Sequence, residues 1–479
     1  MRYLHGAVIA AVLACASPAI GATRSPIHLE AEKGALTGLS ILHDTPGFTG
    51  TGYVGIFDQP TSKLTFTIPN AAAGIYRVVV RYNAPGEKGF DLVVNDGKYS
   101  GMFPASGNGF ARHDAGRVEL KHGVNTVGIE KGWGWYSIDS LDLIPNTATS
   151  KTRKPSVTPA DPKASTEARS VLKYLVRQYG SKTLSGQYDP GDNAYVREKT
   201  GQLPAIQGGD FMEYSPSRRE HGSNPDNESE KMIKVAQSGQ LVTMTWHWNA
   251  PSGLIDKDLT DAQGNKVDAR WYRGFYTSAT TFDLAAALAA PNSPEYKLLL
   301  RDMDVIAAEL QKFQEAGVPV LWRPLHEADG GWFWWGAKGP KAFKALWRLM
   351  YDRFTNVHHL HNLIWVSCSG IKPEWYPGDK YVDIVGIDAY PSDTADPLSS
   401  TWDILVKQYG GRKMLAVTEF GGVPDVEKMH RFGTAWSYFV SWSGDLGAKK
   451  MPDGLLKTLY TAKDIVNKDG LPHGITSRR

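Results

Sequence analysis

The chain has only 2 cysteines among 479 residues, and it has no large excess of either charge, with 53 basic and 50 acidic side chains. The sequence also contains no basic stripe with interleaved aromatic residues, which argues against nucleic acid or an anionic membrane surface as a partner. Its apolar run over residues 7–16 is too short to span a membrane stably. We therefore expect a neutral partner, no nucleic acid and no membrane span.

The first 22 residues have the pattern of a secretory signal peptide, with Arg2 before the apolar run and small residues up to Ala22. Cleavage there would remove Cys15 and leave Cys368, so the mature protein could form no internal disulfide. We expect a secreted protein, extracellular or periplasmic, and a monomer. In an alternative interpretation residues 12–15 (VLAC) form a lipoprotein signal with Cys15 acylated, although the apolar stretch before it is short.

Residues 26–145 alternate short apolar runs with glycine, proline and an Asn-Asp-Gly turn. A period of two with closely spaced turns predicts an antiparallel β-sandwich of jelly-roll type. Residues 146–165 follow with many Pro, Thr, Ser and Lys residues and few apolar ones, which predicts an extended linker. Candidate strands of the sandwich are 63–68, 76–82, 90–94 and 117–120.

Residues 166–475 change to an alternation of strands and helices. In residues 303–313, apolar side chains recur every three or four positions, which predicts an amphipathic helix before the strand at 318–325. Eight such units predict a (β/α)8 TIM barrel, in which catalytic groups lie at the carboxyl ends of the strands. The candidate strands end near Gln187, Asp210, His247, Glu327, Ser369, Tyr390, Glu419 and Trp442.

Two of these strands end in a glutamate followed by glycines and aromatic residues. Residues 321–336 (LWRPLHEADGGWFWWG) contain Glu327, and residues 414–422 (MLAVTEFGG) contain Glu419. Cleavage of a glycosidic bond needs one protonated carboxyl group and one ionised carboxylate. On the fourth and seventh strands the two would face each other at the short separation of a retaining enzyme, about 5–5.5 Å. The alternative is that each glutamate only pairs with a local arginine such as Arg323.

A zinc site at His326 and Glu327 is disfavoured, because the HExxH motif requires a second histidine where Gly330 stands. His247, within residues 246–251 (WHWNAP), is placed to bind a sugar hydroxyl, and the alternative is a core histidine. Tyr390 could donate its hydroxyl to the ionised carboxylate. Trp442 could support the sugar being cleaved, although for these two aromatic residues simple packing under the barrel rim is equally consistent with the sequence.

Several of these motifs, in this order, resemble glycoside hydrolase family 26, most of whose members are endo-β-1,4-mannanases. They are residues 323–327 (RPLHE), 331–336 (GWFWWG), 246–251, 386–390 (GIDAY) and 418–421 (TEFG). The resemblance implies a (β/α)8 barrel, retention of configuration, Glu327 as acid/base and Glu419 as nucleophile. It also implies a subsite lined by His247, His326, Trp332, Tyr390 and Trp442. One departure is Ala328-Asp329, where the family commonly has Met-Asn, which puts fine subsite preference in doubt.

Residues 28–32 (HLEAE), 132–136 (GWGWY) and 138–143 (IDSLDL) resemble carbohydrate-binding module family 35. In that family acidic residues of the first and last strands hold a structural calcium ion, a cation that prefers oxygen ligands. The resemblance implies calcium on Glu30, Glu32 and Asp139, with Asp142 in reserve, and stacking of a sugar ring on Trp133 or Trp135. The alternative for the carboxylates is an ordinary charged surface.

The sequence thus predicts a secreted enzyme that hydrolyses internal bonds of mannan, galactomannan or glucomannan from plants, with no cofactor for catalysis. One alternative is a β-1,3-xylanase or a mixed-linkage β-glucanase of the same family. Another is a binding protein without activity, built on a decayed barrel.

Overall fold

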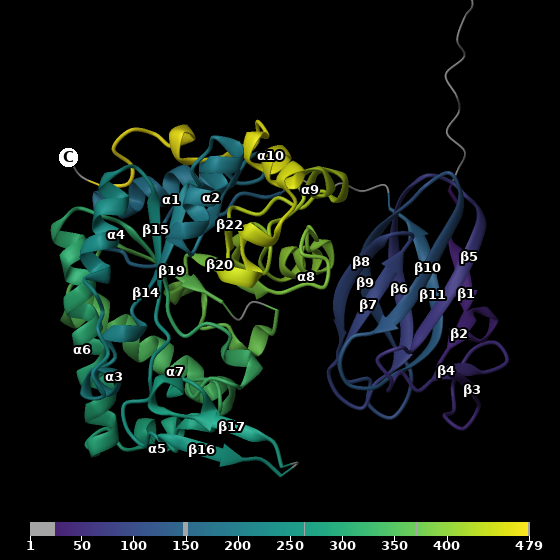
Figure 1. The fold of residues 1–479 in the computed structure, drawn as a ribbon, viewed down its shortest axis with the longest axis horizontal. Helices are drawn as coiled ribbons and strands as arrows, with labels where there is room; N and C mark the ends of the chain where they lie inside the picture. The colour runs from purple at the N-terminus through teal and green to yellow at the C-terminus, as the bar shows by residue number, and fades with distance from the viewer. Residues whose placement is uncertain (1–23, 147–151, 263, 369–370, 478–479) are drawn as a thin grey trace, which may run out of the picture.

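The computed structural model describes residues 24–146, 152–262, 264–368 and 371–477. The expected signal peptide and Cys15 therefore lie outside the described residues. The chain forms two bodies that lie side by side, a β-sandwich near the N-terminus and a larger α/β barrel (Figure 1). Within the described ranges, no helix combines the length and the apolar character needed to cross a membrane.

The N-terminal body consists of two antiparallel sheets, which confirms the predicted β-sandwich. Apolar side chains such as Val78, Leu92 and Ile129 are fully buried, because alternate residues of each strand face the space between the sheets. One sheet contains β1 (Ile27–Glu30), β3 (Ser40–Leu42), β4 (Tyr53–Gly55), β6 (Gly74–Asn83), β9 (Ala111–Leu120) and β11 (Ser137–Pro145). The other contains β2 (Ala35–Thr37), β5 (Lys63–Ala71), β7 (Lys88–Val94), β8 (Gly97–Phe103) and β10 (Gly123–Lys131).

The second body is a closed barrel of parallel strands, as predicted. Glu419 lies on the seventh strand and Glu327 follows the fourth, so the expected strand positions of both glutamates are confirmed. The fifth strand ends at Ser367, close to the expected end, whereas Ser369 lies outside the described residues. In chain order the strands are β13 (Gly186–Gln187), β14 (Ile206–Asp210), β15 (Leu241–Thr245), β18 (Val320–Arg323), β19 (Leu363–Ser367), β20 (Ile384–Ala389), β21 (Met414–Phe420) and β22 (Phe439–Ser441).

Helices surround the barrel, and α6 (Pro294–Glu315) shows why they form. Ser293 caps its first turn, and Met303, Ile306, Leu310 and Phe313 bury one face against the strands, as their spacing predicted. The other helices are α1 (Thr166–Gln178), α2 (Pro190–Thr200), α3 (Pro216–Glu220), α4 (Glu228–Gln237), α5 (Leu284–Ala289), α7 (Gly339–Asp352), α8 (Ser399–Tyr409), α9 (Val426–Phe432) and α10 (Asp453–Thr461). Two short strand pairs complete the fold, β12 (Thr183–Leu184) with β23 (Ile465–Val466) and β16 (Lys257–Thr260) with β17 (Lys266–Ala269).

The segment at 152–165 differs from the extended linker expected over 146–165. The backbone N–H of Ala160 donates to Asp383 over 2.6 Å, and the hydroxyl of Tyr351 donates to the carbonyl of Ala160 over 2.8 Å. Asp161 is buried and lies 2.8 Å from His361. Polar contacts thus attach this segment to the barrel. Its low content of apolar residues did not predict such an attachment. Residues 147–151 lie outside the described ranges.

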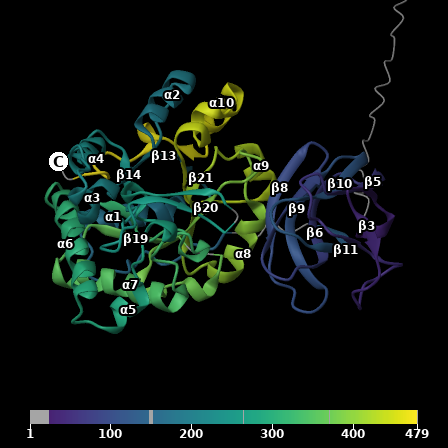
Figure 2. The same ribbon diagram turned by 60° about the horizontal axis from the view of Figure 1, so that its bottom comes forward.

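The sandwich meets the barrel along α8 and α9, with β8 and β9 on the facing side (Figure 2). Arg117 of β9 is buried and donates to Asp403 of α8 over 2.8 Å. The ring of Tyr99 on β8 meets Phe432 of α9 edge to face, with 5.9 Å between the ring centroids. The two bodies are therefore in specific contact.

Candidate active site

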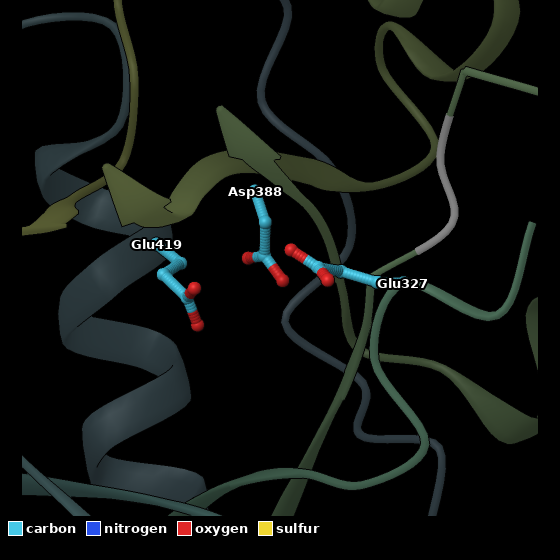
Figure 3. A group of neighbouring side chains, drawn as sticks. All are labelled: Glu327, Asp388 and Glu419. Atoms are coloured by element: carbon cyan, nitrogen blue, oxygen red, sulfur yellow. The ribbon is translucent and has the colours of Figure 1, made fainter. Parts of the chain in front are cut away.

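Glu327 and Glu419 project toward each other at the carboxyl ends of the barrel strands (Figure 3). One carboxylate oxygen from each lies within 4.8 Å of the other, which fits the short separation expected of a retaining enzyme. Glu327 follows β18, where it and Leu325 take left-handed backbone conformations with φ of 52° and 54°. Such conformations cost energy in residues other than glycine and gather at functional sites.

Asp388, near the end of β20, is the third carboxylate of the site and was not among the expected residues. It lies between the two glutamates (Figure 3), and its nearest oxygen is within 4.8 Å of theirs. Arg323 donates to it over 2.6 Å, and the Thr418 hydroxyl donates over 2.8 Å. Its position at a predicted strand end was the available signal, since carboxylates at such ends face the barrel mouth.

The three carboxylates have the spacing of metal ligands. Arg323, however, is completely buried and donates to both Asp388 and Glu419. A fixed guanidinium already supplies the positive charge that a cation would bring, and it would repel that cation. The cluster is therefore better suited to proton transfer and nucleophilic attack than to metal binding.

Glu419 receives the donors that stabilise an ionised carboxylate. Nη2 of Arg323 lies 2.7 Å from its Oε2, and the hydroxyl of Tyr390 donates to its Oε1. Burial and the negative charge of Asp388 raise the pKa of Glu419 to about 7, although Arg323 and Tyr390 act in the opposite direction. The pKa of Glu327 is raised further, to about 8. The expected hydrogen bond from Tyr390 is present, and so is the pairing with Arg323 that the sequence left open as an alternative.

Glu327 has a different environment. Its Oε2 accepts a hydrogen bond of 2.9 Å from the indole nitrogen of Trp332, which is 47 % exposed. Burial and the negative charges of Asp388 and Glu419 raise the pKa of Glu327 more than this bond lowers it. No arginine donates a hydrogen bond to Glu327 among the described contacts, whereas Arg323 donates to Glu419. Glu327 is therefore the carboxyl that keeps the proton of the pair.

His247 and His326 form a buried chain of hydrogen bonds. Their Nε2 atoms are 3.1 Å apart, and Nδ1 of His247 contacts Asp210. Burial, Arg323 and His247 lower the pKa of His326, so His326 is neutral and accepts from His247. Nδ1 of His326 then donates toward Thr245 over 3.3 Å. Asp210 ends a predicted strand and orients His247, a role that the sequence did not reveal.

Trp442 lies on the Glu419 side of the site. Its ring meets Tyr188 at 4.8 Å between centroids and His247 at 6.3 Å. The Tyr188 hydroxyl accepts a hydrogen bond of 2.9 Å from Nε of Arg323. Trp442 and Tyr188 therefore pack beside the same arginine that donates to Glu419. Of the five barrel residues expected beside the two glutamates, Trp332 contacts Glu327 and Tyr390 contacts Glu419. The other three contact one another, since His247 meets both His326 and Trp442.

In the sandwich, the expected calcium ligands surround the loop at 49–51. Thr49 donates to Glu30 and Asp139, each over 2.8 Å, and Thr51 donates to Glu32. One buried oxygen of Glu32 has no hydrogen-bond partner, which suits an oxygen-coordinated cation. Two neighbouring carboxylates are less available, because arginines pair with them: Arg81 with Asp139 and Arg112 with Asp142. His28 lies between Asp142 and Glu30 and contacts both, so among the described residues Glu30 has only a histidine as its ion-pair partner. The donor set thus fits calcium best at Glu30 and Glu32.

Comparison with known proteins agrees with both bodies. Residues 160–470 match the model of glycosyl hydrolase family 26, and residues 27–146 match that of carbohydrate binding module (family 35). A mannan endo-1,4-beta-mannosidase of Thermothelomyces thermophilus is 40 % identical over 457 residues, which is 95 % of this chain and 92 % of that protein. A mannan endo-1,4-beta-mannosidase A of Piromyces is 32 % identical over 96 % of this chain and 75 % of its own length.

Solved structures resemble most of the chain as well. A Podospora anserina GH26-CBM35 beta-(1,4)-mannanase superposes with a TM-score of 0.67 at 39 % identity, covering 94 % of this chain and 99 % of that one. A ruminal GH26 endo-beta-1,4-mannanase superposes with a TM-score of 0.65 at 28 % identity, with the same coverage of 94 % and 99 %. The likeness therefore extends over both the sandwich and the barrel.

Proposed function

The chain belongs to glycosyl hydrolase family 26, and we propose that its barrel is an endo-β-1,4-mannanase in which Glu327 is the acid/base and Glu419 the nucleophile. The observation that carries the assignment is the unequal support of two carboxyl groups whose oxygens lie within 4.8 Å of each other. Arg323 and Tyr390 favour the ionised form of Glu419, and the pKa of Glu327 is raised further than that of Glu419, so Glu327 keeps the proton of the pair. No cofactor takes part in the hydrolysis.

In the first step, Glu419 attacks the anomeric carbon of the mannose on its side of the cleft. The bond from that carbon to the glycosidic oxygen breaks as Glu327 donates its proton to the departing oxygen. The reducing-end part of the polysaccharide leaves, and the remaining sugar is covalently bound to Glu419.

In the second step, Glu327 is a carboxylate and takes a proton from water. The water oxygen attacks the anomeric carbon from the face that the leaving group vacated, and the bond to Glu419 breaks. Two inversions give net retention, and both carboxyl groups return to their starting states. His247, His326, Tyr390 and Trp442 would surround the mannose that is attacked.

A substrate panel tests the assignment. Release of reducing ends from galactomannan and glucomannan, with little from β-1,3-xylan or lichenan, is the expected result. One relative over 33 % of the chain is named Endoglucanase H, so lichenan is an informative member of the panel. Release only from xylan or lichenan would show that the enzyme is instead a β-1,3-xylanase or a mixed-linkage β-glucanase. No release from any polymer would favour a binding protein.

Azide separates the roles of the two glutamates. Glu327→Ala and Glu419→Ala should each lose at least about 10³-fold in activity on mannans. On an activated aryl mannoside, azide should rescue Glu327→Ala with a β-glycosyl azide, because a covalent intermediate on Glu419 still forms. It should rescue Glu419→Ala with an α-glycosyl azide by direct displacement. The opposite pairing would exchange the two assignments.

Three accompanying proposals concern the rest of the chain. The sandwich carries calcium at Glu30 and Glu32, with Asp139 adjoining, and this rests on the unpartnered oxygen of Glu32. Export after cleavage near Ala22 is supported by the N-terminal sequence and by a polymer substrate too large to enter cells. The sandwich spans residues 26–145 and the barrel residues 166–475, and residues 152–165 between them are attached to the barrel.

A further inference from the structure

A cavity of about 460 Å³ beside Glu327 is lined by both domains. The barrel contributes Glu327, Trp332 and Lys372, and the sandwich contributes Glu87, Met102 and Trp133. A residue of the N-terminal module therefore borders the same space as the proposed catalytic acid. If the module acted only as a separate anchor to polysaccharide, no such shared wall would be needed.

Direct contacts fix the module in this position. Nζ of Lys372 lies 2.9 Å from Glu87 and 3.4 Å from the carbonyl of Asp329, two residues after the catalytic acid. On the other side, Ser392 contacts Asp91 and Ser100 of the module, and it follows Tyr390 by two residues. The module thus contacts Lys372, which bonds to the loop after Glu327, and the loop that follows Tyr390.

The cavity reaches from the proposed catalytic acid to the module, and Asp388 and Tyr390 also line it. The nucleophile defines the opposite side, where Trp442 and His247 lie within 6.3 Å of each other. The acid must reach the oxygen between the two sugars, so the departing part of the chain lies beyond Glu327, away from Glu419. Trp133 lines the same cavity as Glu327, whereas Glu419 is not among the described residues that line it, so the departing part of the chain has a path to the module.

Two exposed indoles, one from each domain, border the cavity. Trp133 is 54 % exposed and Trp332 is 47 % exposed. Each rests on a glycine: a methyl group at Gly89 would lie 2.3 Å from the Trp133 ring, and one at Gly330 would lie 2.1 Å from the Trp332 ring. Flat aromatic faces beside a few polar groups, here Glu87 and Lys372, are typical of carbohydrate sites.

From these observations we propose that the N-terminal module completes the catalytic cleft, with Trp133 and Glu87 forming a sugar-binding subsite for the reducing-end part of the mannan chain. This inference rests on the proposed function of the barrel. The module then acts in the turnover of each chain, because a chain bound across the active site also stacks on Trp133.

Two substrates distinguish this role from simple anchoring. Mannohexaose needs sugars bound beyond the cleaved bond, whereas para-nitrophenyl β-mannotrioside has a small leaving group that does not reach Trp133. Trp133→Ala should lower kcat/KM on mannohexaose roughly tenfold, the scale of one lost aromatic contact, and change the aryl substrate by less than about twofold. Trp133→Phe should recover most of the loss, because a ring remains.

Val124→Ala is the matched control, an exposed apolar residue of the module that does not line this cavity, and it should leave both substrates unchanged. The inference is overturned if Trp133→Ala keeps full activity on mannohexaose while losing only binding to insoluble mannan. Equal losses on both substrates, or an unfolding temperature that falls in Trp133→Ala, would also overturn it. An inactive wild type would instead count against the proposed function.

Discussion

Nη2 of Arg323 lies 2.7 Å from Oε2 of Glu419, and both side chains are buried. Water does not reach the pair, so the positive charge of Arg323 acts on Glu419 with little screening. Trp332 gives Glu327 only a neutral donor, over 2.9 Å. The difference in donors separates two chemically identical carboxyl groups into an acid and a nucleophile.

Tyr390→Phe removes a donor to the ionised form of Glu419 without removing a charge. The pKa of Glu419 should rise, since this hydrogen bond lowers it. The acid limb of the kcat/KM profile should move to higher pH, because Glu419 must be ionised to attack, and kcat should fall roughly tenfold to hundredfold. A profile of kcat/KM from pH 4 to 9 checks this, and an unmoved acid limb would contradict it.

Asp388→Asn removes a negative charge that faces both glutamates. Burial is the largest cause of their raised pKa values and Asp388 is the next, so both pKa values should fall. Both limbs of the pH profile should then move to lower pH. A shift of one limb alone would show that Asp388 acts on a single glutamate, and an unchanged unfolding temperature serves as the control for the Arg323 contact.

Trp332→Phe keeps an aromatic face but loses the N–H that donates to Glu327. This hydrogen bond lowers the pKa of Glu327 against burial and the neighbouring carboxylates, so its loss should raise that pKa. Because Glu327 must be protonated to assist departure, the basic limb should move to higher pH while the acid limb stays. Movement of the basic limb in the other direction would contradict the assigned role.

Calcium should raise the unfolding temperature of the sandwich by a few degrees, and a chelator should reverse the effect, because the ion binds the folded form. Glu32→Gln should abolish this response, since Glu32 has the unpartnered oxygen. Asp58→Asn, at an exposed carboxylate of the same domain, should retain it. A response that survives in Glu32→Gln would exclude the proposed ligands, and differential scanning calorimetry measures it.

Much of the site was predictable because it follows from local pattern. The position of Glu327 after the fourth strand and Glu419 on the seventh follows from hydrophobic runs that end in carboxylates. Asp388 also stands near the end of a strand, but a single aspartate within residues 386–391 (GIDAYP) gives no sign of the side chains that face it. The hydrogen bonds from Arg323 to two strands distant in sequence could not be read from residue order.

The sequence by itself determined the two fold classes and the pair of glutamates, because alternation, helical spacing and strand ends are local properties of a chain. Only the tertiary structure decided which carboxyl keeps the proton, since that depends on burial and on donors from separate strands. It also decided that residues 152–165 lie on the barrel and that Trp133 faces the cleft of Glu327. Contacts between segments far apart in sequence depend on how the elements pack, and no periodic pattern in the sequence reports that packing.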